Sequence, residues 1–511
     1  MDATSRVLAA GESTTIEPPA NWLPESLFSS GALSAMPSLQ LGRALDYVVH
    51  YPYGCLEQTV SGAFTLLYAG DWAGRLLPAG RAIGDVDAWV PAAIARVLSM
   101  QQESGGFAMW PFANGTEADA SLYAIHFLLE AKAAGFDVPA DLLDEALDWV
   151  RGRLDHAVPT AATEDEWILE MQARAYQCYL LALAGRPDAG WNARLREQSA
   201  KLNFAARAQT AAALLLAGEP RQATPLLDSM ALPVSRVRVP GRLLDSDVRD
   251  AALLMSAWLD VDPGNVAVER LAQYLRDGQR DGHWGNTQDD AMALLAFGKL
   301  ARQLPADEQP FSGTLELPGG EVRQFSGTND VSWSLDPGQS GAVTVKNVGP
   351  GKLYLWARHE GVSAKPEAAL EQGVSIRREF LDMDGQPLDP TELPQGELIV
   401  VRLTVDTKDR LLDQLVIEDL LPAGWEIENP NLATSQQFNW LKKKEEPDRH
   451  REARDDRMLI FTDAIQGEAV FHYAVRATTP GTYTLPPIVV SGMYEPEIRG
   501  VGAGGQVRVV P

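Results

Sequence analysis

The pattern of apolar residues changes once along the chain of 511 residues, near residue 305, and this change limits the folds open to it. Before that point, segments rich in Ala and Leu repeat with the period of amphipathic helices. After it, Val, Thr, Gly and Pro are frequent, and apolar residues alternate with period two as in strands. Because the chain is also too long for one compact domain, the sequence predicts a multidomain α + β protein with its helices first.

The first part of the chain predicts about a dozen helices joined by short loops that contain Gly and Pro. Short loops make consecutive helices antiparallel, and six such pairs can close into an α/α toroid. The segment 208–217 (AQTAAALLLA) is apolar enough for a helix on the inner side of such a ring. The loops at 101–110 and 280–288 each place glycines and an aromatic residue before a helix, which is a weak internal repeat.

The second part predicts short strands about every ten residues, separated by turn signals, which is typical of antiparallel β-sandwiches. The segment 361–373 has the composition of a linker between two series of strands. A run of mixed charge at 441–457 indicates a solvated loop or a short exposed helix.

The formal net charge of −25 argues against binding to nucleic acid or to an anionic membrane surface, since both need a basic surface. No run of about 18 apolar residues is present, and residues 1–11 do not form a secretory signal. The two cysteines, Cys55 and Cys178, are too few to make disulfides a basis of the fold. The cysteine count does not separate cytoplasm from periplasm.

The segment 51–58 (YPYGCLEQ) carries the clearest chemistry. Cys55 follows Gly54 at the expected start of a helix, where free N–H groups and the helix dipole stabilise a thiolate. Gln58 lies three residues later, on the same face of that helix. A thiol and a carboxamide held together can condense with loss of ammonia to an internal thioester, which is a strong electrophile. An isolated Cys-x-x-Gln pair is more often an ordinary buried cysteine beside a helical glutamine.

The neighbouring residues decide between these readings. Gly54, Cys55, Leu56, Glu57 and Gln58 match the thioester motif G-C-x-E-Q of the α2-macroglobulin and complement family. Further segments resemble that family in the same order along essentially the whole chain, and Tyr51-Pro-Tyr53 resembles its bacterial branch. These segments are 105–110 (GGFAMW), 284–291 (WGNTQDDA), 421–425 (LPAGW) and 491–495 (SGMYE).

The resemblance implies an architecture in which an α/α toroid is inserted into a CUB-like β domain. Residues 1–20 and 306–367 are then the two pieces of the CUB-like domain, and residues 21–305 are the thioester-containing toroid. Residues 368–511 are a C-terminal macroglobulin domain of the β-sandwich class. Since family members are far longer, the resemblance also implies a fragment of a larger protein.

The resemblance further implies a single-turnover protease trap rather than an enzyme, with no cofactor and no metal. Cleavage of a bait region elsewhere exposes the thioester, and lysine amines of the attacking protease open it. Tyr51 and Tyr53 next to the motif, and Met493 and Tyr494 by resemblance, are expected to shield the thioester from water. Complement-type members use a histidine to direct the thioester to hydroxyl groups, and no such histidine can be assigned here.

The histidines in the relevant half of the toroid lack the family context. His126, on an apolar helix, is typical of a core histidine, and His156 has no matching surroundings. The segment 164–171, where the family places its histidine, contains none. Direct attack by amines is therefore expected.

Two other functions remain open. A terpenoid cyclase could also use an α/α toroid, but it needs an acid cluster or a zinc site, and the nearest cluster, Asp245-Ser-Asp-Val248, lacks the final acid. The protein could instead be a non-reactive binding or scaffold module of the cell envelope. The resemblance implies the periplasm, a lipid anchor on the full-length protein in the inner membrane, and association with a peptidoglycan-synthesising penicillin-binding protein.

Overall fold

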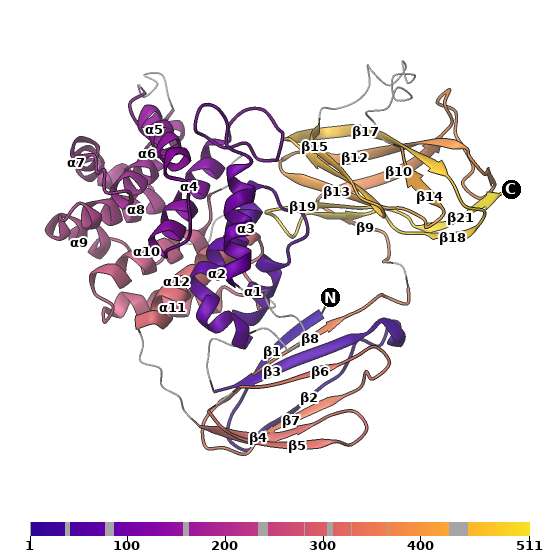
Figure 1. Ribbon diagram of the computed structural model, residues 1–511, viewed down its shortest axis with the longest axis horizontal. Coiled ribbons are helices and arrows are strands. Elements are labelled where there is room, and N and C mark those ends of the chain that lie inside the picture. The colour runs from indigo at the N-terminus through magenta and orange to yellow at the C-terminus, as the bar shows by residue number, and fades with distance from the viewer. Residues whose placement is uncertain are drawn as a thin grey trace. The chain divides into compact units, whose positions relative to one another are not determined.

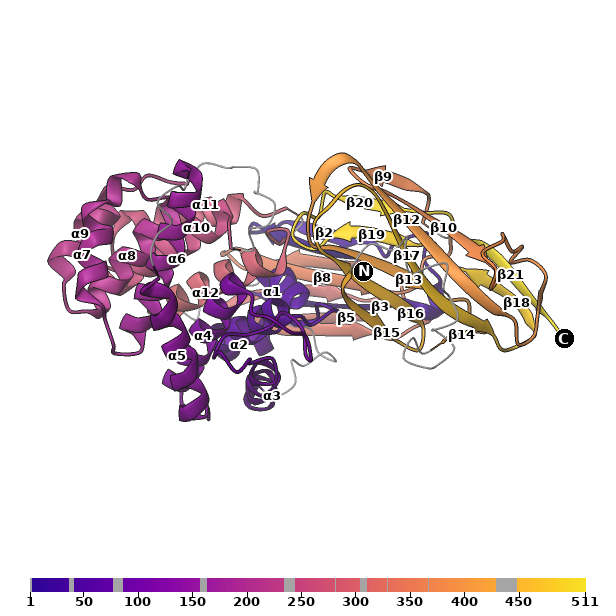
Figure 2. The same cartoon turned by 90° about the horizontal axis from the view of Figure 1, so that it is seen from above.

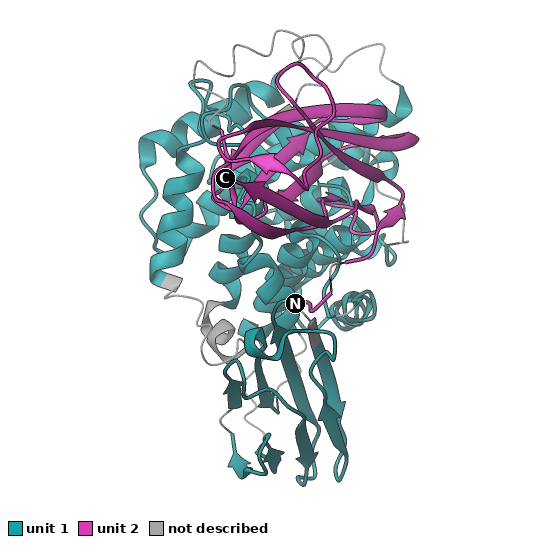
Figure 3. Cartoon of the chain, turned by 90° about the vertical axis from the view of Figure 1, so that its right-hand side faces the viewer, with its two compact units in different colours: residues 1–238, 242–362 teal, residues 239–241, 363–511 magenta. Residues whose placement is uncertain are grey.

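The structure is a computed structural model, and it divides into two compact units (Figure 3). Unit 1 comprises residues 1–238 and 242–362, and unit 2 comprises residues 239–241 and 363–511. The residues whose placement the structure describes are 2–35, 41–76, 86–156, 163–233, 244–280, 282–303, 310–328, 330–365, 367–428 and 448–511.

The helices of unit 1 follow one another along the chain (Figure 1). They are α1 (Gly42–Val49), α2 (Leu56–Leu76), α3 (Val86–Leu98), α4 (Ala118–Ala133), α5 (Ala140–Leu154), α6 (Glu164–Leu183), α7 (Ala189–Glu197), α8 (Phe204–Leu216), α9 (Pro220–Asp228), α10 (Asp247–Val261), α11 (Val266–Asp277) and α12 (Thr287–Gln303). None of the helices within the described ranges is long and apolar enough to cross a lipid bilayer.

The even-numbered helices form a closed inner ring. Helix α2 packs on α4, and contacts continue through α6, α8 and α10 to α12, which packs back on α2. The odd-numbered helices cover this ring from outside; α5, for example, contacts both α4 and α6. Because inner and outer helices alternate along the chain in antiparallel pairs, the inner helices run in the same direction. Their N-termini therefore gather at one end of the ring.

The burial pattern explains which helices lie inside. In α12 every side chain from Thr287 to Gly298 is buried, as expected for a helix surrounded by others. The outer helix α11 instead buries one stripe, formed by Val268, Leu271, Ala272 and Leu275. The expected α/α toroid is thus present, and the predicted α + β fold class is confirmed.

Unit 1 also contains a β-sandwich whose strands come from both sides of the helices (Figure 2). One sheet has the order β1-β8-β3-β6 and the other has the order β2-β7-β4-β5. The strands are β1 (Asp2–Leu8), β2 (Ser13–Ile16), β3 (Phe28–Ser34), β4 (Phe311–Glu316), β5 (Val322–Gly327), β6 (Val331–Leu335), β7 (Val343–Asn347) and β8 (Leu353–Glu360). Leu33, Leu315, Trp333 and Leu355 are part of the core between these sheets.

Strand β3 lies within the range 21–305 that the sequence assigned to the toroid. It pairs with β8 on one side and β6 on the other, and the helices begin only at α1. The segment FSSGALS has no clear period-two pattern, since all its residues but Phe28 are buried. Gly31 is required there because a Cβ atom at this position would meet the Trp333 ring at 2.1 Å.

A buried ion pair joins the sandwich of unit 1 to the helical ring. Arg358 of β8 donates to Asp46 of α1, and both side chains are buried. Asp46 also lies 3.0 Å from the ring of His50. The start of the helical region is therefore fixed against the sandwich by a buried charge pair.

Unit 2 is built from antiparallel strands around its own apolar core, which includes Ile399, Leu403, Ile417 and Phe471. Its sheets have the orders β10-β12-β17-β14, β15-β16-β13-β19-β20-β9 and β11-β21-β18, the last with one parallel pair. The strands are β9 (Leu370–Gln372), β10 (Ser375–Leu381), β11 (Leu393–Pro394), β12 (Leu398–Leu412), β13 (Leu415–Leu420), β14 (Trp425–Ile427), β15 (Asp448–Ala453), β16 (Arg457–Thr462), β17 (Ile465–Ala477), β18 (Gly481–Leu485), β19 (Val489–Gly492), β20 (Arg499–Val501) and β21 (Gly505–Val510). Of the charged run 441–457, predicted as a solvated loop or short exposed helix, residues 441–447 lie outside the described residues. Residues 448–453 instead form strand β15, which pairs with β16, so the prediction was wrong for this part.

Candidate functional site

The segment 51–58 lies where α2 begins, at the end of the ring where the inner helices have their N-termini. Gly54 has a φ of +79°, a conformation that favours glycine and turns the chain into the helix. The backbone N–H of Leu56 donates to the carbonyl of Met109 at 2.8 Å, and that of Thr59 donates to the carbonyl of Cys55 at 2.9 Å. The loop and the first turn of α2 are thus fixed by backbone contacts.

Gln58 folds back onto the backbone that precedes its own helix. Its Oε1 accepts hydrogen bonds from the N–H groups of Gly54 at 2.9 Å and Cys55 at 3.1 Å. The Cys55 side chain is 1% exposed and that of Gln58 is 4% exposed. The structure therefore brings together the two residues that the sequence predicted as a reactive pair.

The carboxamide has a defined orientation because only its oxygen can accept from two N–H donors. Its Nε2 is buried and has no hydrogen-bond partner. A buried, unsatisfied donor costs about 1–3 kcal/mol. A thioester would lack this NH₂ group and keep the carbonyl oxygen, so this orientation suits condensation, in which the nitrogen leaves as ammonia.

Glu57 points into the helical ring and anchors the start of α2. Its carboxylate accepts from the hydroxyl of Ser61 at 2.5 Å and from that of Thr287 at 2.9 and 3.1 Å. The Ser61 hydroxyl also lies 3.2 Å from that of Tyr123 on α4. Together with Leu56, which is completely buried, these contacts tie the motif to α4 and α12.

Tyr51 and Tyr53 belong to a row of aromatic rings beside the motif. Tyr47 and Tyr51 have centroids 5.3 Å apart, Tyr51 and Tyr53 have centroids 5.4 Å apart, and Tyr47 stacks on His283 at 4.8 Å. Burial raises the pKa of Tyr51 well above its usual value, and nearby phenols and Glu57 add to the shift. The row is apolar enough to shield a nearby group, but the shielding role stays a prediction.

Met493 and Tyr494 follow β19 in unit 2. The backbone N–H of Met493 donates to the carbonyl of Gln414 at 3.0 Å, and both side chains are buried. Their predicted role at the thioester came from the resemblance alone and stays a prediction.

The two histidines considered from the sequence have different surroundings. His126 is buried in the ring, with its nitrogens 3.1 Å from the Tyr176 hydroxyl and 3.2 Å from that of Tyr179. Burial lowers its pKa. These contacts are those of a core histidine. His156 is exposed at the end of α5, and its Nδ1 lies 2.6 Å from the carbonyl of Gly152.

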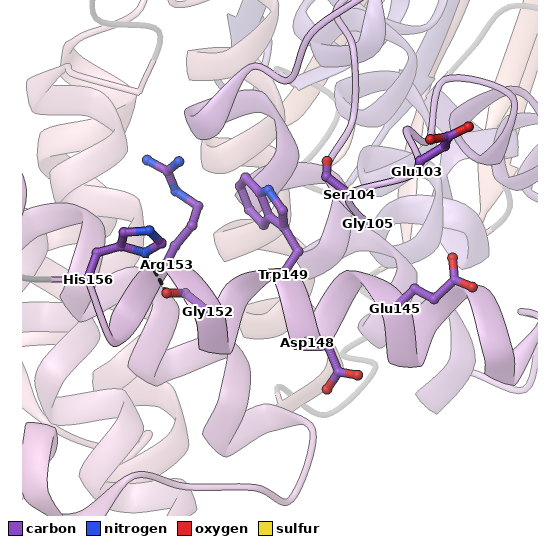
Figure 4. A pocket seen from close by; sticks show the side chains of 9 residues that line it. All are labelled: Glu103, Ser104, Gly105, Glu145, Asp148, Trp149, Gly152, Arg153 and His156. Atoms are coloured by element: carbon purple, nitrogen blue, oxygen red, sulfur yellow. Dashed lines mark hydrogen bonds between the residues drawn. The ribbon is translucent and has the colours of Figure 1, made fainter.

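A surface groove of about 530 Å³ runs between the loop at 103–105 and helix α5 (Figure 4). Its walls carry the carboxylates of Glu103, Glu145 and Asp148, and the guanidinium of Arg153 lies 5.2 Å from the Trp149 ring. The groove contains exposed side chains and no buried polar group aimed into it. Among the described residues, no group of three or more His, Cys, Asp or Glu side chains could hold a metal ion.

Sequence reasoning missed several residues that support the motif. Thr287 was noted only as part of a family segment, and neither Ser61 nor Arg96 was singled out. Arg96, on α3, donates from Nη2 to the carbonyl of Gly54 at 2.6 Å. No periodicity or spacing rule relates positions 54 and 96, so this contact depends on the folded ring.

Comparison with known proteins places the chain in a family. A sequence profile for the bacterial α2-macroglobulin MG10 domain matches residues 373–497. The α2-macroglobulin of Escherichia coli (strain K12) is 30% identical over 520 residues, covering 96% of this chain and 30% of the relative. That of Xylella fastidiosa (strain Temecula1) is 29% identical over 522 residues, with the same two coverages.

Solved structures give the same result. Salmonella α2-macroglobulin reacted with methylamine matches all of this chain with a TM-score of 0.83 and 29% identity, over 34% of its own length. Native E. coli α2-macroglobulin from domain MG7 to the C-terminus matches all of it with a TM-score of 0.81 and 26% identity, over 82% of that chain. This chain belongs to the bacterial α2-macroglobulin family.

The suspected resemblance is thereby confirmed. The chain spans about 30% of the length of these curated α2-macroglobulin relatives. The activity and partners of a whole α2-macroglobulin are consequently matters of proposal for this chain.

Proposed function

We propose that this chain carries an internal thioester between Cys55 Sγ and Gln58 Cδ and uses it to trap an attacking protease covalently. The observation that carries the proposal is the geometry of Gln58. Its carbonyl oxygen is held by the N–H groups of Gly54 and Cys55, while its amide nitrogen is buried without a partner. The family membership supports the same reading.

The thioester forms when the Cys55 thiol adds to Gln58 Cδ and ammonia leaves. In trapping, an amine nitrogen of the target adds to the same carbon, and the C–S bond breaks. Gln58 Cδ ends in an amide bond to the target, the amine loses a proton to solvent, and Cys55 takes up a proton as a thiol. The acyl carbon, Gln58 Cδ, stays bonded to the target, so each chain reacts once and is not an enzyme.

Amines on the surface of the protease, chiefly lysines, are the proposed nucleophiles. No histidine is placed in the motif, and the two candidates have other contacts. The Salmonella relative was solved after reaction with methylamine, which is a small amine nucleophile. Cleavage of a bait region in a longer protein is the proposed trigger.

The mass of the chain tests the proposal. A thioester makes the untreated protein lighter by one ammonia, and methylamine then adds to it with release of one thiol. Cys178 is buried, and burial raises its pKa to about 12; the C55A variant, which keeps Cys178, measures any thiol signal that it contributes. The variants C55A and Q58E should show neither the missing ammonia nor methylamine uptake.

The same experiment distinguishes the proposed thioester trap from the alternative, a non-reactive binding or scaffold module. Peptide masses report whether residue 58 is Gln or has become Glu. Glu at this position with a titratable Cys55 means that a thioester formed and was hydrolysed, which supports the proposal. Gln at this position, with full mass and no methylamine uptake, contradicts it and favours the scaffold.

The location and wider partnerships stay predictions. We propose a periplasmic site of action, a lipid anchor on the longer protein and association with a peptidoglycan-synthesising penicillin-binding protein. These proposals rest on the resemblance. A membrane-impermeant label that reaches the protein after the outer membrane is permeabilised, but not in intact cells, would support the first of them.

A further inference from the structure

Both ends of the peptide unit between Gly54 and Cys55 are engaged in the site. At one end, Nη2 of Arg96 donates to the Gly54 carbonyl at 2.6 Å. At the other end, the N–H of Cys55 donates to Gln58 Oε1 at 3.1 Å. The side chain of Arg96 is exposed, and within the described parts of the chain no carboxylate pairs with its charge.

This arrangement joins a positive charge to the carbonyl of Gln58 through one peptide. A cation at the oxygen of a peptide group draws electrons toward that oxygen and makes the N–H at its other end a stronger donor. Hydrogen bonds in such a chain strengthen one another by roughly 10–30% each. The Cys55 N–H therefore gains donor strength because of Arg96.

Gln58 Oε1, which accepts the hydrogen bond from the Cys55 N–H, is also the atom on which negative charge develops during the reaction. When a nucleophile adds to Gln58 Cδ, the electron pair of the C=O bond moves onto Oε1 and forms an oxyanion. Donors already placed around such an oxygen lower the barrier most. The N–H groups of Gly54 and Cys55 occupy these places.

We propose that Arg96 is a positioning residue that stabilises the Gln58 oxyanion through the Gly54–Cys55 peptide. The proposal rests on the thioester function above. It applies to both reactions, because formation and aminolysis pass through the same tetrahedral carbon. In aminolysis the electron pair returns from Oε1, the C=O bond reforms and Cys55 Sγ leaves as a thiolate.

A merely structural role makes a different prediction. In this alternative, the sole role of Arg96 is to hold the turn at Gly54. It lies close enough for this, since a Cβ added to Gly54 would come within 3.3 Å of its Nη2. In that case its loss would change folding or thioester yield, but the reactivity of each thioester once formed would stay the same. Reactivity per thioester is therefore the quantity to measure.

The experiment compares R96M, R96K and R153M in the full chain. Arg153 is a matched control, since it is an exposed arginine of the same unit and its charge lies over Trp149. Hydroxylamine is the nucleophile, because it is largely uncharged at neutral pH and its approach is not steered by a surface cation. Thiol release is divided by the amount of thioester present. Intact mass gives that amount as the fraction of protein that is lighter by one ammonia.

We expect R96M to react about two- to eightfold more slowly, a fraction of the roughly 10²–10³ lost when an oxyanion donor is removed outright. R153M should react like the parent, and R96K should recover much of the rate because it keeps a cationic donor. The infrared stretch of a ¹³C-labelled thioester carbonyl should move to higher frequency in R96M, since that carbonyl is less polarised.

An unchanged rate and carbonyl frequency in R96M overturn the proposal. If R96M folds but forms no thioester, recovery in R96K supports the proposal, and failure of a folded R96K overturns it in favour of a structural role. A parent chain that never forms a thioester removes the proposed function and this inference together. A reactive parent with unaffected variants removes only the inference.

Discussion

The hydroxyl of Thr287 donates to the carboxylate of Glu57 from 230 residues further along the chain. The contact closes the helical ring, because Glu57 lies in the first turn of α2 and Thr287 is the first residue of α12. Both side chains are buried, so the carboxylate depends on the donors that surround it. The 54–58 motif is therefore supported by the last helix of its own ring.

Replacing Thr287 by Val should destabilise the chain by about 1–3 kcal/mol, since a buried carboxylate loses a donor. Thioester yield should fall with it, because Glu57 is next to Gln58. Urea unfolding and intact mass measure the two effects. S61A removes another donor to the same carboxylate without touching the contact between α2 and α12. Equal thioester yields in T287V and the parent would contradict the link between ring closure and the motif.

Gly54→Ala should lower methylamine incorporation. A residue with a side chain pays about 1–2 kcal/mol at this positive φ, and its Cβ would also crowd Arg96. Gly115 provides the control, because its φ of +88° is similar and no atom lies within 4 Å of its added Cβ. We expect similar losses of stability in the two variants and a loss of incorporation in G54A alone.

Asp289 should make stability depend on pH. Burial raises its pKa from 3.8 to about 7, and the neighbouring Asp290 adds to the shift. In the folded state the carboxyl then stays protonated over a range in which the unfolded chain has lost the proton. Its contribution is complete below about pH 4 and is lost as the pH rises to about 7.

Urea unfolding of the parent and D289N across this range measures the effect of Asp289. The free energy of unfolding of D289N should fall less between about pH 4 and pH 7 than that of the parent. Parallel curves for the two proteins would mean that Asp289 titrates normally.

The ion pair between Arg358 and Asp46 should be strongly coupled. Both partners are buried, and removing one leaves the other with less compensation, since Glu360 then remains beside Arg358, or His50 beside Asp46. The cost should therefore lie below the roughly 3–5 kcal/mol of a buried charge left wholly unpaired. R358M and D46N alone should each destabilise unit 1, and the double variant should cost less than the sum. Additive losses in a double-mutant cycle would show that the pair contributes no interaction energy of its own.

Tyr51→Ala should speed the loss of the thioester to water, because it removes the ring between Tyr47 and Tyr53. Tyr51→Phe keeps the ring and should behave like the parent. The rate of thiol appearance without added amine measures the shielding directly. M493A in the same assay tests the role that the resemblance alone assigned to Met493.

The sequence could predict the features that depend on local pattern. The pairing of Cys55 with Gln58 follows from helical spacing, and the ring follows from a long series of apolar helices with short loops. Strand β3 could not be recognised, because it is buried on both faces and lacks alternation. The contacts of Arg96 and Thr287 with the motif are likewise set by the folded ring, which brings together positions that no local rule relates.

The position of β3 between β6 and β8 has a mechanical consequence. Strands from before the helices and strands from after them share one sheet, so the ring is tied to the sandwich at both of its ends. A single backbone cut on either side of the helices would leave the ring attached through the other side. The helical ring is thus held to the sandwich by two chain connections, so the proposed trap stays attached after a single cleavage.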